Sequence, residues 1–273
     1  MHTLTSLPVL AVFLTPLPLL APFFVPCTVA NRDGSLTGRR VRLLAVLSMI
    51  LGVISVIVLG CSGSPVEGKL FGIGAFYLAV YFDAVSAIML LLVAFLGVAV
   101  TSFSLNYLGG NPDQGRFFKW LSITLGSVLL LIVSGNLALF TLCWMAISLS
   151  LHQLLTFYPD RPAALMAARK KYLFSRLGDL CLLTALVIAW REFGSLDYAR
   201  LFAIASQGST PALQGIALLL VLAAMIKSAQ FPFHGWLPDT METPTPVSAL
   251  MHAGIINAGG FLIVRFSPLV SFL

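Results

Sequence analysis

The chain has 273 residues, of which 59% are hydrophobic and 10% charged, with a net charge of +6 and a mean hydropathy of +0.98. Apolar runs of about 20 residues, each long enough to cross a bilayer, recur along the sequence. A soluble core cannot absorb so much apolar surface. The composition therefore indicates a multi-pass membrane protein and excludes an ordinary soluble domain.

Apolar segments punctuated by proline, glycine and charge predict eight transmembrane helices. They are expected near residues 7–30, 42–61, 82–105, 117–135, 136–158, 172–192, 212–230 and 246–267. No cleavable signal peptide is expected, because the first apolar segment has no basic region before it. The predicted fold class is an all-α polytopic membrane protein.

The basic residues are distributed unevenly between the two predicted sides of the membrane. Eleven of the sixteen Lys and Arg lie on alternate connections: Arg32, Arg39, Arg40, Arg42, Arg116, Lys119, Arg161, Arg169, Lys170, Lys171 and Arg176. The positive-inside rule places this side in the cytoplasm and both termini outside. The segment from Tyr158 to Lys171 is predicted as a loop that either binds lipid or a partner or only orients the chain. The charge is therefore topological, and we expect no nucleic-acid partner.

Lys227 ends an otherwise uncharged stretch and is followed at once by the helix-breaking sequence SAQFP. A charge at bilayer depth costs roughly 2.5–3.5 kcal/mol on insertion scales, so it usually faces a partner or a hydrated path. Further breaks follow at Pro238, Pro244 and Pro246. Non-helical backbone at membrane depth must be shielded by protein or face water. A discontinuous helix and a hydrated cavity are therefore predicted beside Lys227.

Besides Lys227, a histidine and an Arg-Asp pair are candidates for a proton path. His252 lies about two turns into the last span and can change charge near neutral pH, although a neutral core histidine is equally consistent with the sequence. Arg176 and Asp179, spaced i, i+3, can meet on one face of the sixth helix. This pair is either structural, or Asp179 exchanges partners with Lys227.

His152 in the fifth helix is a second candidate for proton relay, and the alternative is an interfacial histidine hydrogen-bonded to Gln153 or Tyr158. The sequence offers no nucleophile-base set, phosphate-binding loop or nicotinamide fingerprint, so we expect neither an enzyme nor a bound cofactor. The cysteines lie singly, without the spacing of a zinc site. They are Cys27, Cys61, Cys143 and Cys181.

The segment KSAQFPFHGWLP followed by PTPVSALMHAG resembles the proton-conducting antiporter-like subunits of respiratory complex I and of multisubunit cation/proton antiporters. The stretches LHQLLTFYPDRPAALMAARKKYLFSRLGD and HAGIINAGGFLIVRFSPL are similar to one branch, the DabB membrane subunits of inorganic-carbon transport systems. The resemblance implies an inner-membrane subunit that couples cation flow, usually of protons, to carbon uptake. It also implies a partner, DabA, that resembles a zinc carbonic anhydrase.

By this resemblance, Lys227 occupies the position of the family's channel lysine, His252 that of the histidine in the next helix, and Asp179 that of the acid in the Arg-x-x-Asp motif. Met145 stands where these subunits commonly carry a glutamate after a tryptophan. Either Asp179 and His152 take over that relay, or the proton path differs in this branch, or this half conducts poorly.

The resemblance also bears on domain organisation, because family members contain two inverted repeats of five helices. Within a single transmembrane domain, residues 1–105 would form three N-terminal helices and residues 117–267 the first repeat, with the second repeat absent. A second membrane chain or a truncated fragment would each explain this. The alternative functions are a respiratory NADH-quinone oxidoreductase or sodium/proton antiporter subunit, or a non-conducting scaffold for a soluble partner.

Overall fold

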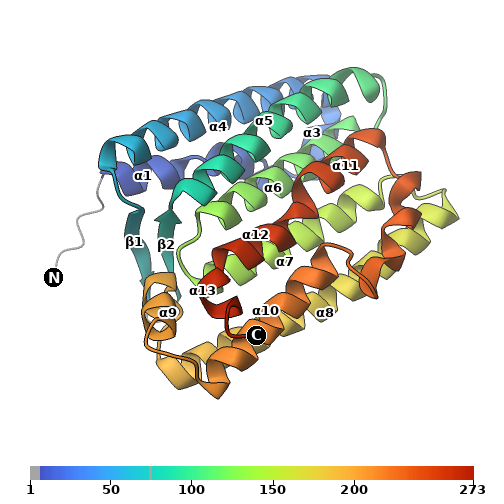
Figure 1. Ribbon diagram of the computed structural model, residues 1–273. Helices are drawn as coiled ribbons and strands as arrows, with labels where there is room; N and C mark the ends of the chain where they lie inside the picture. The colour runs from blue at the N-terminus through green and yellow to red at the C-terminus, as the bar shows by residue number, and fades with distance from the viewer. Residues whose placement is uncertain (1–6, 74–75) are drawn as a thin grey trace.

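Long apolar helices dominate the structure, a computed structural model that describes residues 7–73 and 76–273 (Figure 1). Within these ranges five helices are long and apolar enough to cross a membrane. They are α4 (Gly34–Ser62), α5 (Ala84–Tyr107), α6 (Gln114–Val133), α7 (Leu137–Leu155) and α8 (Pro162–Phe193). A sixth span results if the bent N-terminal segment crosses as one unit. That segment comprises α1 (Leu7–Leu14), α2 (Leu17–Leu20) and η1 (Ala21–Phe24).

The last two predicted spans are a shorter helix and a broken one. The former is α10 (Pro211–Lys227); the latter divides into α11 (Thr245–Leu250), the π-helical turn η4 (Met251–Ile255) and α12 (Asn257–Arg265). The remaining elements are α3 (Cys27–Arg32), β1 (Val66–Ile73), β2 (Phe76–Phe82), α9 (Tyr198–Ala205), η2 (Phe233–Trp236), η3 (Pro238–Glu242) and α13 (Ser267–Val270). Each predicted membrane segment thus matches a helix, a bent pair or a broken helix, which confirms the fold class.

Side-chain caps and helix-breaking residues explain where several helices begin and end. Asp33 and Asp83 accept hydrogen bonds from the amides of the first turns of α4 and α5, and Asn136 does the same for α7. These bonds satisfy donors that a helix start leaves free. Pro162 occupies the first turn of α8, and Gly194, with a φ of 60°, ends that helix.

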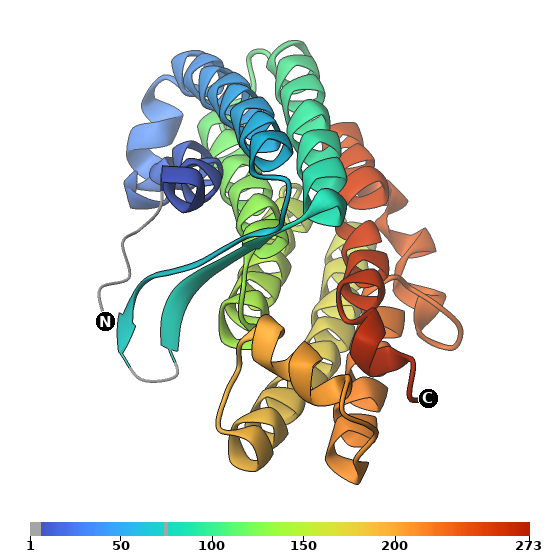
Figure 2. The ribbon, with the colours of Figure 1, turned by 60° about the vertical axis from the view of Figure 1, so that its left-hand side comes forward.

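The helices pack in layers, with α6 and α7 in the middle (Figure 2). On one side α4 and α5 pack together and against α6; on the other, α8 packs against α7 and α10. Among the five long helices α4 is the least buried, and it presents a row of large apolar side chains. They include Leu43, Leu47, Ile50, Ile54 and Ile57. Because a bilayer would cover these apolar side chains, we infer that this face of α4 contacts lipid.

A β-hairpin, which was not predicted from the sequence, follows α4 and lies at one end of the bundle (Figure 1). Strands β1 and β2 pair antiparallel, from Val66 opposite Phe82. Ala79 accepts a hydrogen bond from the amide of Gly135, and the side chain of Asn136 donates to the carbonyl of Tyr77 at 2.6 Å. The hairpin therefore braces the connection between α6 and α7.

The opposite end of the bundle carries the cluster of cations, and here one prediction was wrong. The segment from Tyr158 to Lys171 is not a loop, because α8 begins at Pro162 and runs through Lys171. Arg169 and Lys170 are exposed, but Lys171 is only 2% exposed. The small residues of this first part of α8 are buried against the bundle, which explains why helix rather than loop forms there.

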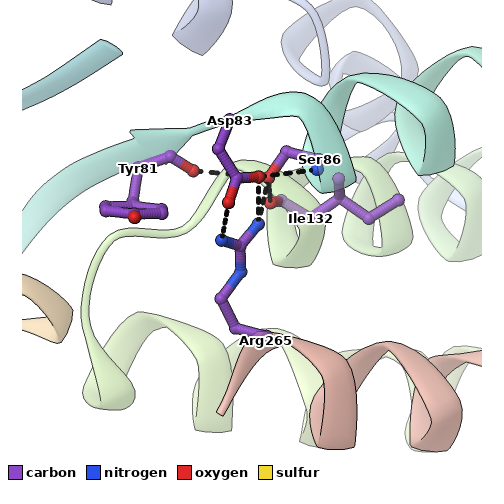
Figure 3. Close-up of polar contacts among 5 residues, drawn as sticks. All are labelled: Tyr81, Asp83, Ser86, Ile132 and Arg265. Atoms are coloured by element: carbon purple, nitrogen blue, oxygen red, sulfur yellow. Dashed lines mark hydrogen bonds and ion pairs between the residues drawn. The ribbon is translucent and has the colours of Figure 1, made fainter. Parts of the chain in front are cut away.

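An ion pair ties the end of α12 to the start of α5 (Figure 3). The guanidinium of Arg265 binds both carboxylate oxygens of Asp83, at 2.7 and 3.0 Å, and also donates to the hydroxyl of Ser86. Burial raises the pKa of Asp83, but the hydrogen bonds from Arg265 and from the Ser86 amide outweigh it, so this pKa lies below its ordinary value. Two segments far apart in the sequence are thereby joined at one point.

Candidate functional site

Lys227 is the last residue of α10, and its side chain is buried, with the residue 5% exposed. The helix ends here because Ala229, two residues on, has a φ of 50°, which an α-helix does not allow. The amine donates a hydrogen bond to the hydroxyl of Ser148 at 2.8 Å and lies 4.5 Å from the ring centre of Trp144. The predicted discontinuity beside Lys227 is confirmed, and the groups that hold the amine come from α7.

A second buried lysine, which was not predicted from the sequence as a site residue, lies at the same point. Lys171 on α8 donates a hydrogen bond to the backbone carbonyl of Ser148 at 3.1 Å. Two amines thus bind one serine, one through its hydroxyl and the other through its carbonyl. The hydroxyl of Ser148 in turn donates to the carbonyl of Trp144 at 3.1 Å. The signal that could have found Lys171 is its spacing along α8 from Ser175 and Gly178, small residues that allow close packing.

A small cavity lies between α8 and α10 beside the two amines. It is lined by Trp144, Lys171, Phe174, Ser175, Gly178, Ala223, Ile226, Lys227, Trp236 and Ile255. Its volume is about 10 Å³, which is room for roughly one water molecule. The indole nitrogen of Trp236 is buried without a hydrogen-bond partner among the described residues. The cavity therefore combines room for a water with polar groups to bind it.

Arg176 and Asp179 form the ion pair that their spacing predicts, with 2.7 Å between Nη2 and Oδ2. Asp179 is 3% exposed, and neither of its oxygens has a donor in hydrogen-bond geometry within the part of the chain described. The carboxylate also interacts electrostatically with Lys227 and Lys171 without touching either. The structure thus brings the acid near both amines while one cation holds it.

His152 lies near the end of α7, away from the cavity lining. Its ring centre is 5.1 Å from that of Tyr172, and its Nδ1 is buried with no hydrogen-bond partner in the described ranges. Neither Gln153 nor Tyr158 therefore binds this nitrogen. His152 remains a predicted relay residue, with this ring nitrogen unpartnered among the described residues.

His252 is exposed on the π-helical turn η4 rather than buried against Lys227. Ile255, from the same turn, lines the cavity of Lys227 instead. Within this chain His252 is therefore not a buried core histidine. The structure brings together Lys227, Asp179 and Arg176 with Lys171, and it leaves His252 on the surface of this chain.

No group of three or more His, Cys, Asp or Glu that could hold a metal ion occurs within residues 7–73 and 76–273. The four cysteines are free.

All five predicted site residues fall in the region that carries a family signature. The family model described as "NADH:quinone oxidoreductase/Mrp antiporter, TM" matches residues 134–273, just over half of the chain. The chain belongs to this family. A second model, for the N-terminus of complex I chain 5, matches residues 72–118.

Relatives within the family come from two kinds of complex. "Probable inorganic carbon transporter subunit DabB2" of Halothiobacillus neapolitanus is 43% identical over 84% of this chain and 41% of the relative. NADH-quinone oxidoreductase subunit L of Mycobacterium tuberculosis is 40% identical over 68% of this chain and 30% of the relative. The chain thus spans less than half the length of these relatives.

A solved Mrp complex from Dietzia sp. contains the same fold. It superimposes with a TM-score of 0.77 at 24% identity, covering 96% of this chain and 28% of that one. The family membership and the apolar helices together establish a multi-pass membrane protein of the antiporter-like type.

Proposed function

We propose that this chain is a proton-conducting membrane subunit of an inner-membrane complex that takes up dissolved inorganic carbon. The name of the relative from Halothiobacillus neapolitanus supports the carbon substrate. In this proposal, CO2 hydration belongs to a zinc-dependent partner of the DabA type, and the present chain moves the charge. Further membrane subunits of the same complex are also part of the proposal.

The observation that carries the proposal is the partner of Lys227. Its buried amine binds a neutral hydroxyl, that of Ser148, rather than a carboxylate. An amine can donate to this hydroxyl when charged and accept from it when neutral. If Lys227 loses its proton, no carboxylate loses a directly paired cation. In a buried ion pair, the same loss would leave the carboxylate without its counter-charge. Lys227 is thus suited to change its charge during turnover.

The proposed path runs from the cation-rich end of the bundle to Lys227 and on towards His252. His152 offers an unpartnered ring nitrogen near that end. Asp179 would stabilise the charged form of Lys227, and its attraction would weaken when Arg176 holds the carboxylate more closely. His252, exposed on the turn that also forms part of the cavity wall, would pass the proton onward from Lys227.

Proton flux in proteoliposomes that hold the complete complex tests the proposal. Wild-type complex should acidify or alkalise the lumen when a pH gradient or potential is imposed, and Lys227→Ala should abolish this flux with assembly unchanged. Lys170→Ala, which removes an exposed lysine of α8, is the matched control and should retain flux. Unchanged flux and unchanged carbon-dependent growth in Lys227→Ala would remove Lys227 from the mechanism.

The identity to NADH-quinone oxidoreductase subunit L supports a second candidate function, that of an antiporter-like subunit of a respiratory or sodium/proton antiporter complex. The chains that co-purify with the protein distinguish the two. A zinc protein supports carbon uptake, whereas quinone oxidoreductase or antiporter subunits support the alternative. A wild-type complex without cation flux would instead leave a scaffold role.

A further inference from the structure

Lys171 is a buried cation that has no role in the proposed path. It lies nine residues into α8, about 14 Å from the helix start at 1.5 Å per residue. Its neighbour Lys170 is half exposed and pairs with Asp239 at 2.6 Å. Lys171 itself has no carboxylate within ion-pair distance in residues 7–73 and 76–273. The acceptor of its hydrogen bond, the backbone carbonyl of Ser148, is neutral.

Ser148 places the two buried amines next to each other. Lys171 binds the carbonyl of this residue and Lys227 its hydroxyl, at 3.1 and 2.8 Å. The two amines interact electrostatically but do not hydrogen-bond each other. Two ammonium groups so close repel, so a proton on one favours the neutral form of the other. The two amines are thus arranged to share one positive charge and not to carry a positive charge each.

The cavity is lined by both lysine residues along one face of α8. Lys171, Phe174, Ser175 and Gly178 follow the i, i+3, i+4, i+7 pattern of a single helix face, and all four line the cavity. Lys227 and Trp236 line it from the other side. One water there could accept from a charged amine and from the free indole N–H of Trp236 while it donates to the neutral amine.

We propose that Lys171 is a proton-relay residue that delivers protons from the cation-rich end of the bundle to Lys227. This inference rests on the proposed function. In the step, an N–H bond of the Lys171 ammonium breaks as its proton passes to the water. An O–H bond of that water breaks as a second proton forms an N–H bond on the neutral Lys227 amine. The water is unchanged, and the positive charge has moved from α8 to α10.

The position of Lys171 along α8 fits this direction of transfer. Arg169 and Lys170 precede it at the exposed end of the helix, and Asp179 follows it two turns deeper. Lys171 therefore lies between the solvent-exposed cations and the buried acid. Consecutive residues of a helix point about 100° apart, so Lys170 lies on the exposed face of α8 and Lys171 on the buried face.

Substitution by arginine and by methionine tests the relay in the reconstituted complex. Lys171→Arg keeps a positive charge but cannot release a proton. Lys171→Met removes both the positive charge and the transferable proton. A relay predicts at least a tenfold loss of proton flux in both variants, with wild-type flux in Lys170→Arg and Lys170→Met. A purely structural cation predicts flux in Lys171→Arg close to wild type, and that result would overturn the inference.

Chemical rescue keeps the test decisive where a larger side chain disturbs packing. Lys171→Ala leaves space beside Ser148, and added methylamine should restore part of the lost flux, whereas tetramethylammonium, which cannot give up a proton, should not. Equal effects of the two, with the complex assembled, would overturn the relay. Flux lost in Lys227→Ala but retained in Lys171→Met contradicts this inference alone. Absence of flux in the wild type contradicts the proposed function itself.

Discussion

Arg265 and Lys227 are both 5% exposed, yet their partners differ in charge. The guanidinium of Arg265 binds both oxygens of Asp83, which also caps α5. The amine of Lys227 binds a serine hydroxyl and faces an indole ring. A guanidinium keeps its proton in proteins, whereas a lysine amine can release it. The cation that joins two spans therefore has a carboxylate partner, whereas the cation to which we assign a change of charge has neutral partners.

Breaking the Arg265 pair should have the largest effect on stability. Asp83→Asn keeps an oxygen that can cap α5 but removes the negative charge, so a buried guanidinium loses its counter-charge. We expect the free energy of unfolding to fall by about 3 kcal/mol, measured as a lower melting temperature of the solubilised protein. Arg265→Lys, which keeps the charge, is the control and should lose less. Equal losses in both variants would show that the forked geometry, and not the charge, holds the joint.

A smaller loss is expected where α12 packs against α10, close to Lys227. A Cβ atom on Gly259 would lie 2.6 Å from the carbonyl oxygen of Ala224, whereas one on Gly260 would meet nothing within 4 Å. Gly259→Ala should destabilise the protein by about 1–3 kcal/mol through overpacking and should reduce proton flux. Gly260→Ala is the matched control. Similar behaviour of the two variants would contradict the close contact between these helices.

The Asp83 pair should also give the protein a specific sensitivity to acid. The pKa of Asp83 in the folded protein is below that of an unfolded aspartate, which is about 3.9, so the carboxylate stabilises the fold above that pH. This contribution is lost as the pH falls from about 4 through the folded pKa. Melting temperatures of wild type and Asp83→Asn should run parallel from pH 5 to 8 and converge below pH 4. A constant difference at all pH values would contradict the pair's role.

The smallest effect is expected at the exposed pair of Lys170 and Asp239, whose side chains are 50% and 39% exposed. Such surface pairs contribute roughly 0–1 kcal/mol and are screened by salt. Lys170→Met should therefore leave both melting temperature and proton flux near the wild-type values. A large loss of flux would mean that η3 must be held against α8 for conduction.

Hydropathy and helix-breaking residues predicted most of the fold, because burial in lipid requires long apolar helices whatever their neighbours. The hairpin was missed because its residues contribute to packing between segments far apart in the sequence, such as Ala79 with Gly135. Strand formation in so short a segment depends on that context.

The site was predicted in part. A lone cation before a helix break identified Lys227, and the i, i+3 spacing identified the pair of Arg176 and Asp179. Lys171 could not be separated from Lys170 by composition, since burial depends on which face of α8 meets α7. The exposure of His252 depends likewise on the rotation of a π-helical turn, which the sequence does not specify.

Substitution of Lys227 by arginine tests the central claim most directly, because arginine retains the positive charge and cannot release a proton. The measurement is proton flux through the assembled complex in proteoliposomes, with Arg265→Lys as the reciprocal control. We predict that Lys227→Arg conducts no faster than protein-free vesicles while Arg265→Lys conducts as the wild type does. Wild-type flux in Lys227→Arg would contradict the claim that this amine changes its charge during turnover.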